Sequence, residues 1–249
     1  MDIKKLFTAK RLIFLTVFLV LVLIAQRINF SPLLGAENQF FTVFQFFGPI
    51  AGSFLGSIFG IITVFLAEIT DFLIVGKTFS LINVLRLLPM LFAVYYFSSF
   101  KDKNKKFSAV ISVLIPLACL ALFVLHPVGR QAWFFSLYWL IPVLGVLLPQ
   151  NWPGQLFFRS YGATFTAHAV GGAIWVYTVP MTAAQWISLI PVVAYERFLF
   201  GLGIAGSYVV FNAVLDYLIE KFNFKVPSSI LFLDKNYSLF KSIVSDKNK

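Results

Sequence analysis

Charged residues are scarce in this chain. Only 12% of its 249 residues are Asp, Glu, Lys or Arg, and 59% are hydrophobic. A soluble domain usually carries about 25% charged residues. With so few charges, a soluble fold could not cover its surface with polar groups. The composition therefore excludes a water-soluble globular protein and predicts an all-α polytopic membrane protein without a soluble domain.

Cysteine and histidine are nearly absent, which limits the chemistry available. The one cysteine, Cys119, forms no internal disulfide and supplies no metal framework. The chain also lacks the HExxH, GxSxG and Walker-type patterns. We therefore expect no cofactor, no metal and no enzymatic activity. An intramembrane hydrolase built on His168 and a carboxylate stays as an alternative.

The net charge of +10 has a specific distribution along the chain. Lysines and arginines gather at the N-terminus, in Lys101–Lys106 and in the tail from Lys221 onward. A basic protein can bind nucleic acid, but clusters between apolar segments are what the positive-inside rule predicts for cytoplasmic loops. We expect the lipid bilayer as a partner and no nucleic acid.

About 20 apolar residues span a bilayer. Clear candidates for crossing segments are residues 9–27, 81–97, 107–125, 131–148, 157–177 and 192–218. The block Gln39–Phe72 is too long for one pass and short for two. With the N-terminus inside, two passes are needed to bring Lys101–Lys106 inside as well.

Pro49 offers a place to divide that block, because proline favours the first turn of a helix. One short helix would end near Phe47 and a second would run from Pro49 to about Asp71, although the first piece could also be a re-entrant half-helix. This predicts a compact bundle of about eight (six to eight) transmembrane helices over residues 1–220, with both termini in the cytoplasm. For the basic tail, residues 221–249, an interfacial amphipathic helix and a solvated segment stay open.

Small residues recur at helical spacing. Gly48, Gly52, Gly56 and Gly60 are four apart, and "SYGATFTAHAVGGA" contains Gly162, Gly171 and Gly172. Helices in lipid associate through close packing, which small residues permit. We predict that these glycines pack helices tightly, in a groove that another backbone or a flat ligand can occupy.

Ionisable residues at membrane depth are functional candidates. In the predicted topology many of them meet near the outer surface. They are Asn38, Gln39, Glu68, Asp71, Asn83, Arg86, His126, Arg130, Glu196 and Arg197. Glu68 and Asp71, three apart, share one helix face. The set predicts either a closed network of structural ion pairs or an outward-facing pocket for a polar or zwitterionic solute.

Other residues near these segments have simpler interpretations. His168 would lie near mid-membrane, either hydrogen-bonded to Thr164 and Thr166 or in contact with a ligand. Arg159 is expected to be a snorkelling anchor at the inner surface. Trp152, Trp175 and Trp186 are expected in the aromatic belts at the two membrane interfaces.

Residues 31–97 contain a short predicted helix ending in "FFGP", the helix "IAGSFLGSIFGIITVFLAEITDFL" and then "LRLLPMLFAVYYF". This order resembles the substrate-binding (S) components of energy-coupling factor transporters. The family's glycine-rich run leading to an acidic residue corresponds to Gly48, Pro49, Gly52 and Gly56, followed by Glu68 or Asp71.

The resemblance implies a helical bundle in the plasma membrane that binds a small, vitamin-like solute at its outer face. A membrane scaffold subunit and a pair of ATPases would then be its partners. Such components have six helices, so Phe107–Leu148 would be an inserted hairpin, and the first helix lacks the family's pair of small residues four apart. A non-transport membrane scaffold protein is the competing interpretation.

Overall fold

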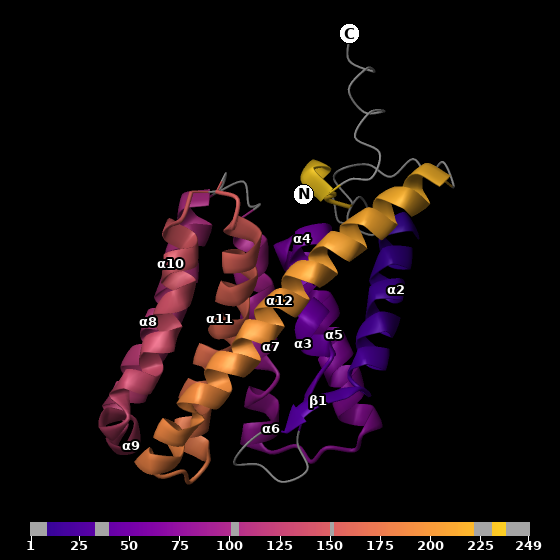
Figure 1. Cartoon of the computed structure of the whole chain (residues 1–249). Helices are drawn as coiled ribbons and strands as arrows, with labels where there is room; N and C mark the ends of the chain where they lie inside the picture. Colours follow the sequence, from indigo (N-terminus) through magenta and orange to yellow (C-terminus); the bar gives the residue numbers. More distant parts are fainter. Residues whose placement is uncertain (1–8, 33–39, 101–104, 150–151, 222–230, 238–249) are drawn as a thin grey trace.

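The computed structural model describes residues 9–32, 40–100, 105–149, 152–221 and 231–237, with the backbone alone for 9–15 and 105. Its long helices run side by side between two ends of the molecule (Figure 1). We call the end where α2 (Ala9–Ala25) begins and α12 (Ala183–Lys221) ends the tail end. The opposite end, which holds a small β-hairpin, is the hairpin end.

The remaining elements follow in chain order. They are β1 (Asn29–Pro32), β2 (Phe40–Thr42), α3 (Phe44–Phe47), η1 (Gly48–Ile50), α4 (Ala51–Leu55), α5 (Ser57–Ile74), α6 (Leu81–Leu85), α7 (Leu88–Ser99), α8 (Lys105–Leu125), α9 (Pro127–Gln131), η2 (Trp133–Leu140), α10 (Ile141–Leu147), α11 (Gln155–Thr178) and η3 (Lys235–Tyr237). The antiparallel hairpin of β1 and β2 pairs Asn29 with Thr42 and Pro32 with Phe40.

The chain alternates in direction through the bundle. In Figure 1, α2, α5, α8 and α11 lead from the tail end to the hairpin end, and the elements between them lead back. Among the described residues, four helical stretches are long and apolar enough to cross a membrane: Ser57–Ile74, Leu81–Ser99, Lys106–Leu125 and Ala183–Lys221. The expected six to eight crossings stay a prediction.

The division of the block from Gln39 to Phe72 was predicted at the wrong residue. Pro49 does begin a helical turn, η1, but the chain continues in the same direction into α4. The reversal occurs at Gly56, whose φ of 84° is a backbone conformation that side-chain-bearing residues rarely adopt. The short first helix therefore extends to Leu55, and α5 begins at Ser57.

The glycine series consequently does not form one face of one helix. Gly52 in α4 lies against Gly60 in α5 so closely that a Cβ on Gly60 would overlap the Gly52 backbone. Gly48 approaches the side chain of Met90, and Gly52 that of Ser98, both on α7. The glycines bring three successive segments together rather than opening a groove.

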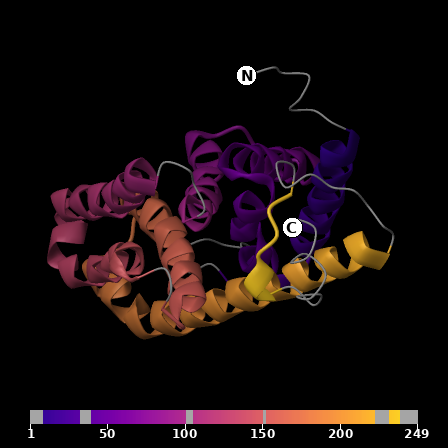
Figure 2. The ribbon, with the colours of Figure 1, turned by 90° about the horizontal axis from the view of Figure 1, so that it is seen from above.

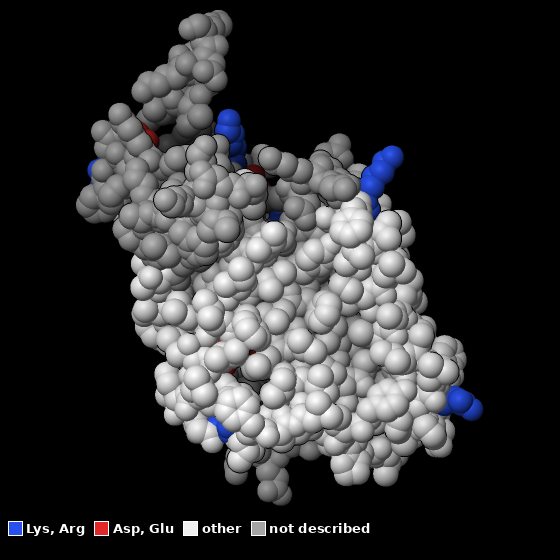
Figure 3. Space-filling view, turned by 180° about the vertical axis from the view of Figure 1, so that it is seen from behind, with Lys and Arg blue, Asp and Glu red and all other residues white. Residues whose placement is uncertain are grey.

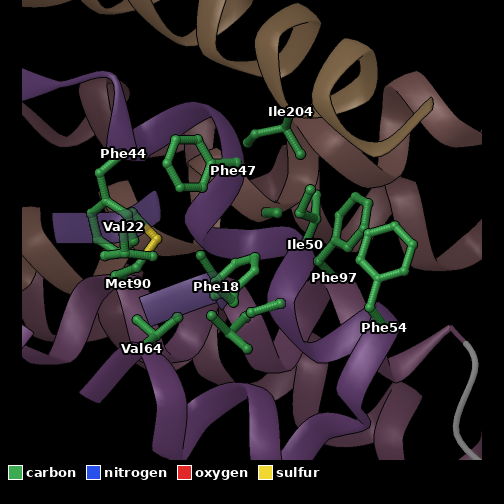
Figure 4. Close-up of a cluster of buried hydrophobic side chains, with 14 of the residues drawn as sticks. Phe18, Val22, Phe44, Phe47, Ile50, Phe54, Val64, Met90, Phe97 and Ile204 are labelled. Atoms are coloured by element: carbon green, nitrogen blue, oxygen red, sulfur yellow. The ribbon is translucent and has the colours of Figure 1, made fainter. Parts of the chain in front are cut away.

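Two groups of buried apolar residues make up the core. The first group contains residues from α2, α3, η1, α4, α5 and α7, with Phe18, Ile50 and Phe97 among its members (Figure 4). The other joins α8, η2 and part of α11 around Phe123 and Trp139. Both α11 and α12 contribute to each group, and Figure 2 shows α12 running along one side of the two. The two long helices therefore connect the two halves of the bundle.

The glycines of α11 serve this connection. A Cβ on Gly162 would overlap the ring of Tyr96, and one on Gly172 would lie 2.5 Å from the indole of Trp139. Tyr96 also donates a hydrogen bond of 2.7 Å to the backbone oxygen of Pro142. The small residues of α11 thus accept aromatic side chains from both halves.

The described part of the tail lies against the bundle. Asn212 of α12 exchanges two hydrogen bonds with the backbone of Asp234, and the Tyr208 hydroxyl donates to the Asp234 carboxylate at 3.0 Å. Leu231 is buried. Partial burial next to Asp234 raises the pKa of Tyr237. The expected interfacial helix of the tail falls mostly on residues 222–230 and 238–249, outside the described residues.

Candidate functional site

A cavity of about 690 Å³ lies toward the hairpin end of the bundle, where the two halves separate. Its wall takes residues from the segment after α2, the β-hairpin, α3, α5, α6 and α7 of one half and from η2, α11 and α12 of the other. Figure 3 shows a largely uncharged face with a hollow near this end, where acidic atoms are visible inside and a basic side chain lies below. The cavity therefore combines ionisable groups with an apolar surrounding.

Most of the predicted site residues line this cavity. They are Glu68, Asp71, Asn83, Arg86, His168, Glu196 and Arg197, with Gly171 and Gly172 beside them. Asn38 and Gln39 lie outside the described residues. The structure thus brings together groups from four segments that are distant in the sequence.

The acidic side of the cavity is on α5. Asp71 forms ion pairs with Arg27 at 2.8 Å and with Lys77 at 3.3 Å. Glu68 lies one turn earlier, and its Oε2 is buried and has no hydrogen-bond partner among the described residues. The side-chain oxygen of Gln26, just after α2, is also buried and has no hydrogen-bond partner among these residues. This side therefore presents acceptors that a bound donor can satisfy.

Arg86 follows α6 at the hairpin end. One of its terminal nitrogens (Nη1) donates to the Asn83 side-chain oxygen at 3.3 Å, and its guanidinium lies 4.7 Å from the ring centroid of Trp175. Asn83 is itself held by hydrogen bonds to Thr78. The Nε of Arg86 is buried without a partner in the described part of the chain. Stacking and the Asn83 contact hold the guanidinium in place and leave one donor available.

Arg197 and Glu196 occupy neighbouring positions on α12, and Arg197 is only 3% exposed. Their charged groups are 3.9 Å apart, too long for a hydrogen bond. The Arg197 guanidinium lies 4.5 Å from the ring centroid of Phe41 and 4.9 Å from that of Phe200. Its Nε is buried with no partner in the described ranges. This arginine is a buried cation whose hydrogen-bonding capacity is only partly used.

His168 has an unexpected partner. Trp139, rather than Thr164 or Thr166, donates its indole N–H to Nδ1 of His168 at 3.0 Å. Because Nδ1 accepts, the hydrogen of a neutral imidazole is on Nε2, which is then a donor. His168 is therefore hydrogen-bonded to the core and also lines the cavity, while its contact with a ligand stays a prediction.

Aromatic rings complete the wall, and one of them corrects an expectation. Trp175 and Trp186 both line the cavity, and Trp186 is too buried to stand in a lipid-facing belt. Trp186 is 2% exposed and packs edge-to-face on Phe135 at 5.0 Å between ring centroids. Its indole N–H is buried without a partner among the described residues. The position of each tryptophan near the end of a segment predicted its depth in the membrane, but not whether its ring faces lipid or the interior of the bundle.

Two predicted residues do not reach the cavity. His126 caps the short helix α9, accepting from the backbone N–H of Val128, and its ring packs on Tyr177. Arg130 is exposed. The turn between α8 and α9 lies at the outside of the second half, away from the β-hairpin (Figure 1). Their assignment to a common pocket was therefore wrong, because depth in the membrane does not fix position around the bundle.

Sequence reasoning missed several residues of the wall. Arg27 and Lys77 sit where helices end, and they were counted only as helix boundaries or loop residues. The β-hairpin places Phe40, Phe41 and Thr42 at the cavity, and no alternation signal indicates such short strands. The signal that could have identified Arg27 and Lys77 was an acidic partner at the same end of a neighbouring helix, such as Asp71.

A second buried arginine lies away from the cavity. Arg159, 6% exposed, donates through Nε to the backbone oxygen of Phe97 at 2.6 Å and hydrogen-bonds to Ser53. Its guanidinium covers the Phe97 ring at 3.9 Å. It is a packed structural residue and not a snorkelling anchor. Within the described ranges, no cluster of His, Cys, Asp and Glu could hold a metal ion.

Comparison with known proteins places few limits on function. No family model matches the chain, and no solved structure matches it. The chain is 24% identical over 205 residues to an uncharacterized protein of Methanocaldococcus jannaschii, a match that covers 76% of this chain and 67% of that protein. These comparisons indicate no enzyme family or enzyme fold.

Proposed function

We propose that this chain is an integral membrane protein that binds a small solute in the cavity at its hairpin end. The observation that carries the proposal is the set of buried side-chain atoms around one volume that have no hydrogen-bond partner among the described residues, namely Oε2 of Glu68, Nε of Arg86 and Nε of Arg197. Buried polar groups are normally hydrogen-bonded, and exceptions call for an explanation. A bound solute supplies the missing partners.

The proposal includes an orientation. The bundle would cross the cell membrane in eight segments, with both termini in the cytoplasm and the cavity open to the outside. Lysines of 101–106 and of the tail would then meet the inner surface, as the positive-inside rule requires. The alternating direction of the segments in Figure 1 is compatible with this arrangement.

In transport, the chain would be a solute-binding subunit. It contains no phosphate-binding loop, so partner ATPases and a membrane scaffold subunit would supply the energy. The resemblance of residues 31–97 to S components supports this assignment. In the structure, α8 and α9–α10 lie together as a hairpin beside α11, which fits the interpretation of Phe107–Leu148 as an addition to a six-helix bundle.

The orientation is tested with single cysteines. Cys119 is buried and is first replaced by serine. We expect Phe79→Cys, at an 80% exposed position beyond α5, to react with a membrane-impermeant maleimide on intact cells. Lys106→Cys, at the start of α8, should react only after permeabilisation. The reverse pattern contradicts the orientation.

The function is tested by mild purification from the native cells and native mass spectrometry. A retained small metabolite, or co-purified scaffold and ATPase subunits, supports the proposal. Arg86→Gln should release a retained metabolite, whereas the matched change Arg130→Gln, outside the cavity, should not. A chain that arrives without solute and with only envelope-assembly proteins supports the scaffold alternative.

A further inference from the structure

We infer that the solute of this cavity is a dipolar molecule, with an anionic group at one end, a protonated amine at the other and an apolar middle. The inference rests on the proposed solute-binding function and specifies its ligand. The residues that carry it are the unpartnered groups of the cavity wall, sorted by the helix that holds each one.

The acceptors are on one side. Glu68 on α5 and Gln26, in the turn after α2, both have a buried side-chain oxygen without a partner in the described part of the chain. The neighbouring Asp71 is already paired with Arg27 and Lys77, so these cations are engaged by a different carboxylate. The unused capacity of this side is therefore that of an acceptor, and Glu68 is the group that would meet a protonated amine.

The donors are on the other side. Arg197 and Trp186 on α12 each have a buried N–H without a partner among the described residues. Arg86, between α6 and α7, has a third such N–H, and its guanidinium lies against the ring of Trp175 on α11, so it belongs to this side. His168 on α11 interacts electrostatically with Arg197, and Phe135 contacts both His168 and Trp186 at 5.5 and 5.0 Å between ring centroids. Trp139 holds His168 so that Nε2 is the donor. This side is suited to a carboxylate or another compact anion.

The two sides belong to different parts of the bundle. Helix α5 packs on α2, α4 and α7, whereas α12 packs on α3 and α11. The cavity lies between them, and its wall carries Phe72, Met90 and Phe135. A ligand that satisfies both sides therefore needs its charges separated by an apolar part. A purely anionic solute would leave the buried Oε2 of Glu68 without a hydrogen bond, and a purely cationic one would leave the buried Nε of Arg197 without one, because Glu196 pairs only with a terminal nitrogen of Arg197.

The test uses three probes that share a para-substituted benzene ring and differ in charge. They are para-(aminomethyl)benzoate, para-methylbenzoate and para-methylbenzylamine, titrated calorimetrically into the full chain in lipid nanodiscs. We expect the dipolar probe to bind at least about tenfold more tightly than either singly charged one, because a charge-assisted hydrogen bond contributes on that scale.

Variants assign the two ends. Glu68→Gln should bring the dipolar probe down to the affinity of para-methylbenzoate, and Arg197→Gln should bring it down to that of para-methylbenzylamine. Arg130→Gln should change neither. If Arg197→Gln does not fold, the comparison of probes on the wild-type chain and on Glu68→Gln still decides the question.

Two outcomes overturn the inference. A singly charged probe that binds as tightly as the dipolar one would show that the cavity selects one sign of charge. Failure of all three probes to bind would overturn it as well, because the dipolar probe carries both charges and the apolar middle that the inference requires. In both cases the proposed function is judged separately, because native mass spectrometry reports a retained metabolite whatever its charge.

Discussion

Arg159 illustrates at the residue scale how a charge can be accommodated in this bundle. Its guanidinium is buried against Phe97 and hydrogen-bonded to a backbone oxygen and to Ser53. Arg159→Gln cannot reach both partners and leaves the Phe97 oxygen buried without its donor. We expect a loss of roughly 3 kcal/mol in the free energy of unfolding, the scale of hydrogen bonds to charged groups.

The measurement uses the buried thiol of Cys119, which reacts with a thiol-specific fluorescent dye only as the protein unfolds. Arg159→Gln should lower the unfolding temperature clearly, and Arg130→Gln, at an exposed position, should leave it unchanged. Equal unfolding temperatures for the two variants would show that Arg159 is not a structural residue.

The prediction of individual residues from the sequence depended on depth along each helix. Glu68, Arg86 and Arg197 were expected near the outer ends of their segments; all three line the cavity, and the side of the membrane that it faces stays a prediction. It failed where the position around the bundle mattered, as for His126 and Trp186. A single sequence shows how far along a helix a residue lies, but the packing of α11 and α12 determines which side of the bundle it faces.

At the scale of elements, the hairpin of α4 and α5 depends on close contact between Gly52 and Gly60. A side chain on Gly60 overlaps the α4 backbone, and an overpacked contact costs about 1–3 kcal/mol. We expect Gly60→Val to lower the unfolding temperature. Gly206→Val, on a helix with open space around the glycine, should leave it unchanged or raise it slightly.

A stable Gly60→Val variant would mean that α4 and α5 can separate without loss, which is incompatible with the packing described. The reversal itself could not be located from the sequence. Four glycines at equal spacing in an apolar block offer four places for a turn, and Pro49 favours a helix start. The turn lies at Gly56, where φ is positive, because α4 and α5 both pack on α7. Those contacts are not visible in the sequence.

The attachment of the tail to α12 gives a second element-scale prediction. Asn212, with no exposed surface, holds the backbone of Asp234 through two hydrogen bonds of 2.9 and 2.7 Å. Asn212→Leu removes both, so the segment 231–237 should become more accessible to added protease. We expect faster cleavage in limited proteolysis, measured by intact mass, while Val214→Leu, at an exposed position of α12, cleaves like the wild type. Unchanged cleavage of Asn212→Leu would show that other contacts hold the segment.

For the whole molecule, the cavity lies toward the hairpin end between residues of the two halves, and α11 and α12 contribute to the cores of both. A sequence with this distribution of charge predicts the ends at which acids and arginines collect. It does not predict an enclosed volume, because that volume depends on how far apart two separately packed cores are held. The β-hairpin, which closes one side, was likewise not indicated by the sequence.

The cavity can therefore be filled without disturbing either core. Gly171 lies on the cavity wall, and a Cβ there would meet only the Pro89 ring, at 3.7 Å. Gly171→Leu should place its side chain in the empty volume, fold with an unfolding temperature close to that of the wild type, and lose any metabolite retained in native mass spectrometry. Gly206→Leu, outside the cavity, should retain it. If Gly171→Leu unfolds at the wild-type temperature and still carries the metabolite, the solute binds elsewhere. The volume between the two halves would then be a consequence of their packing and not a binding site.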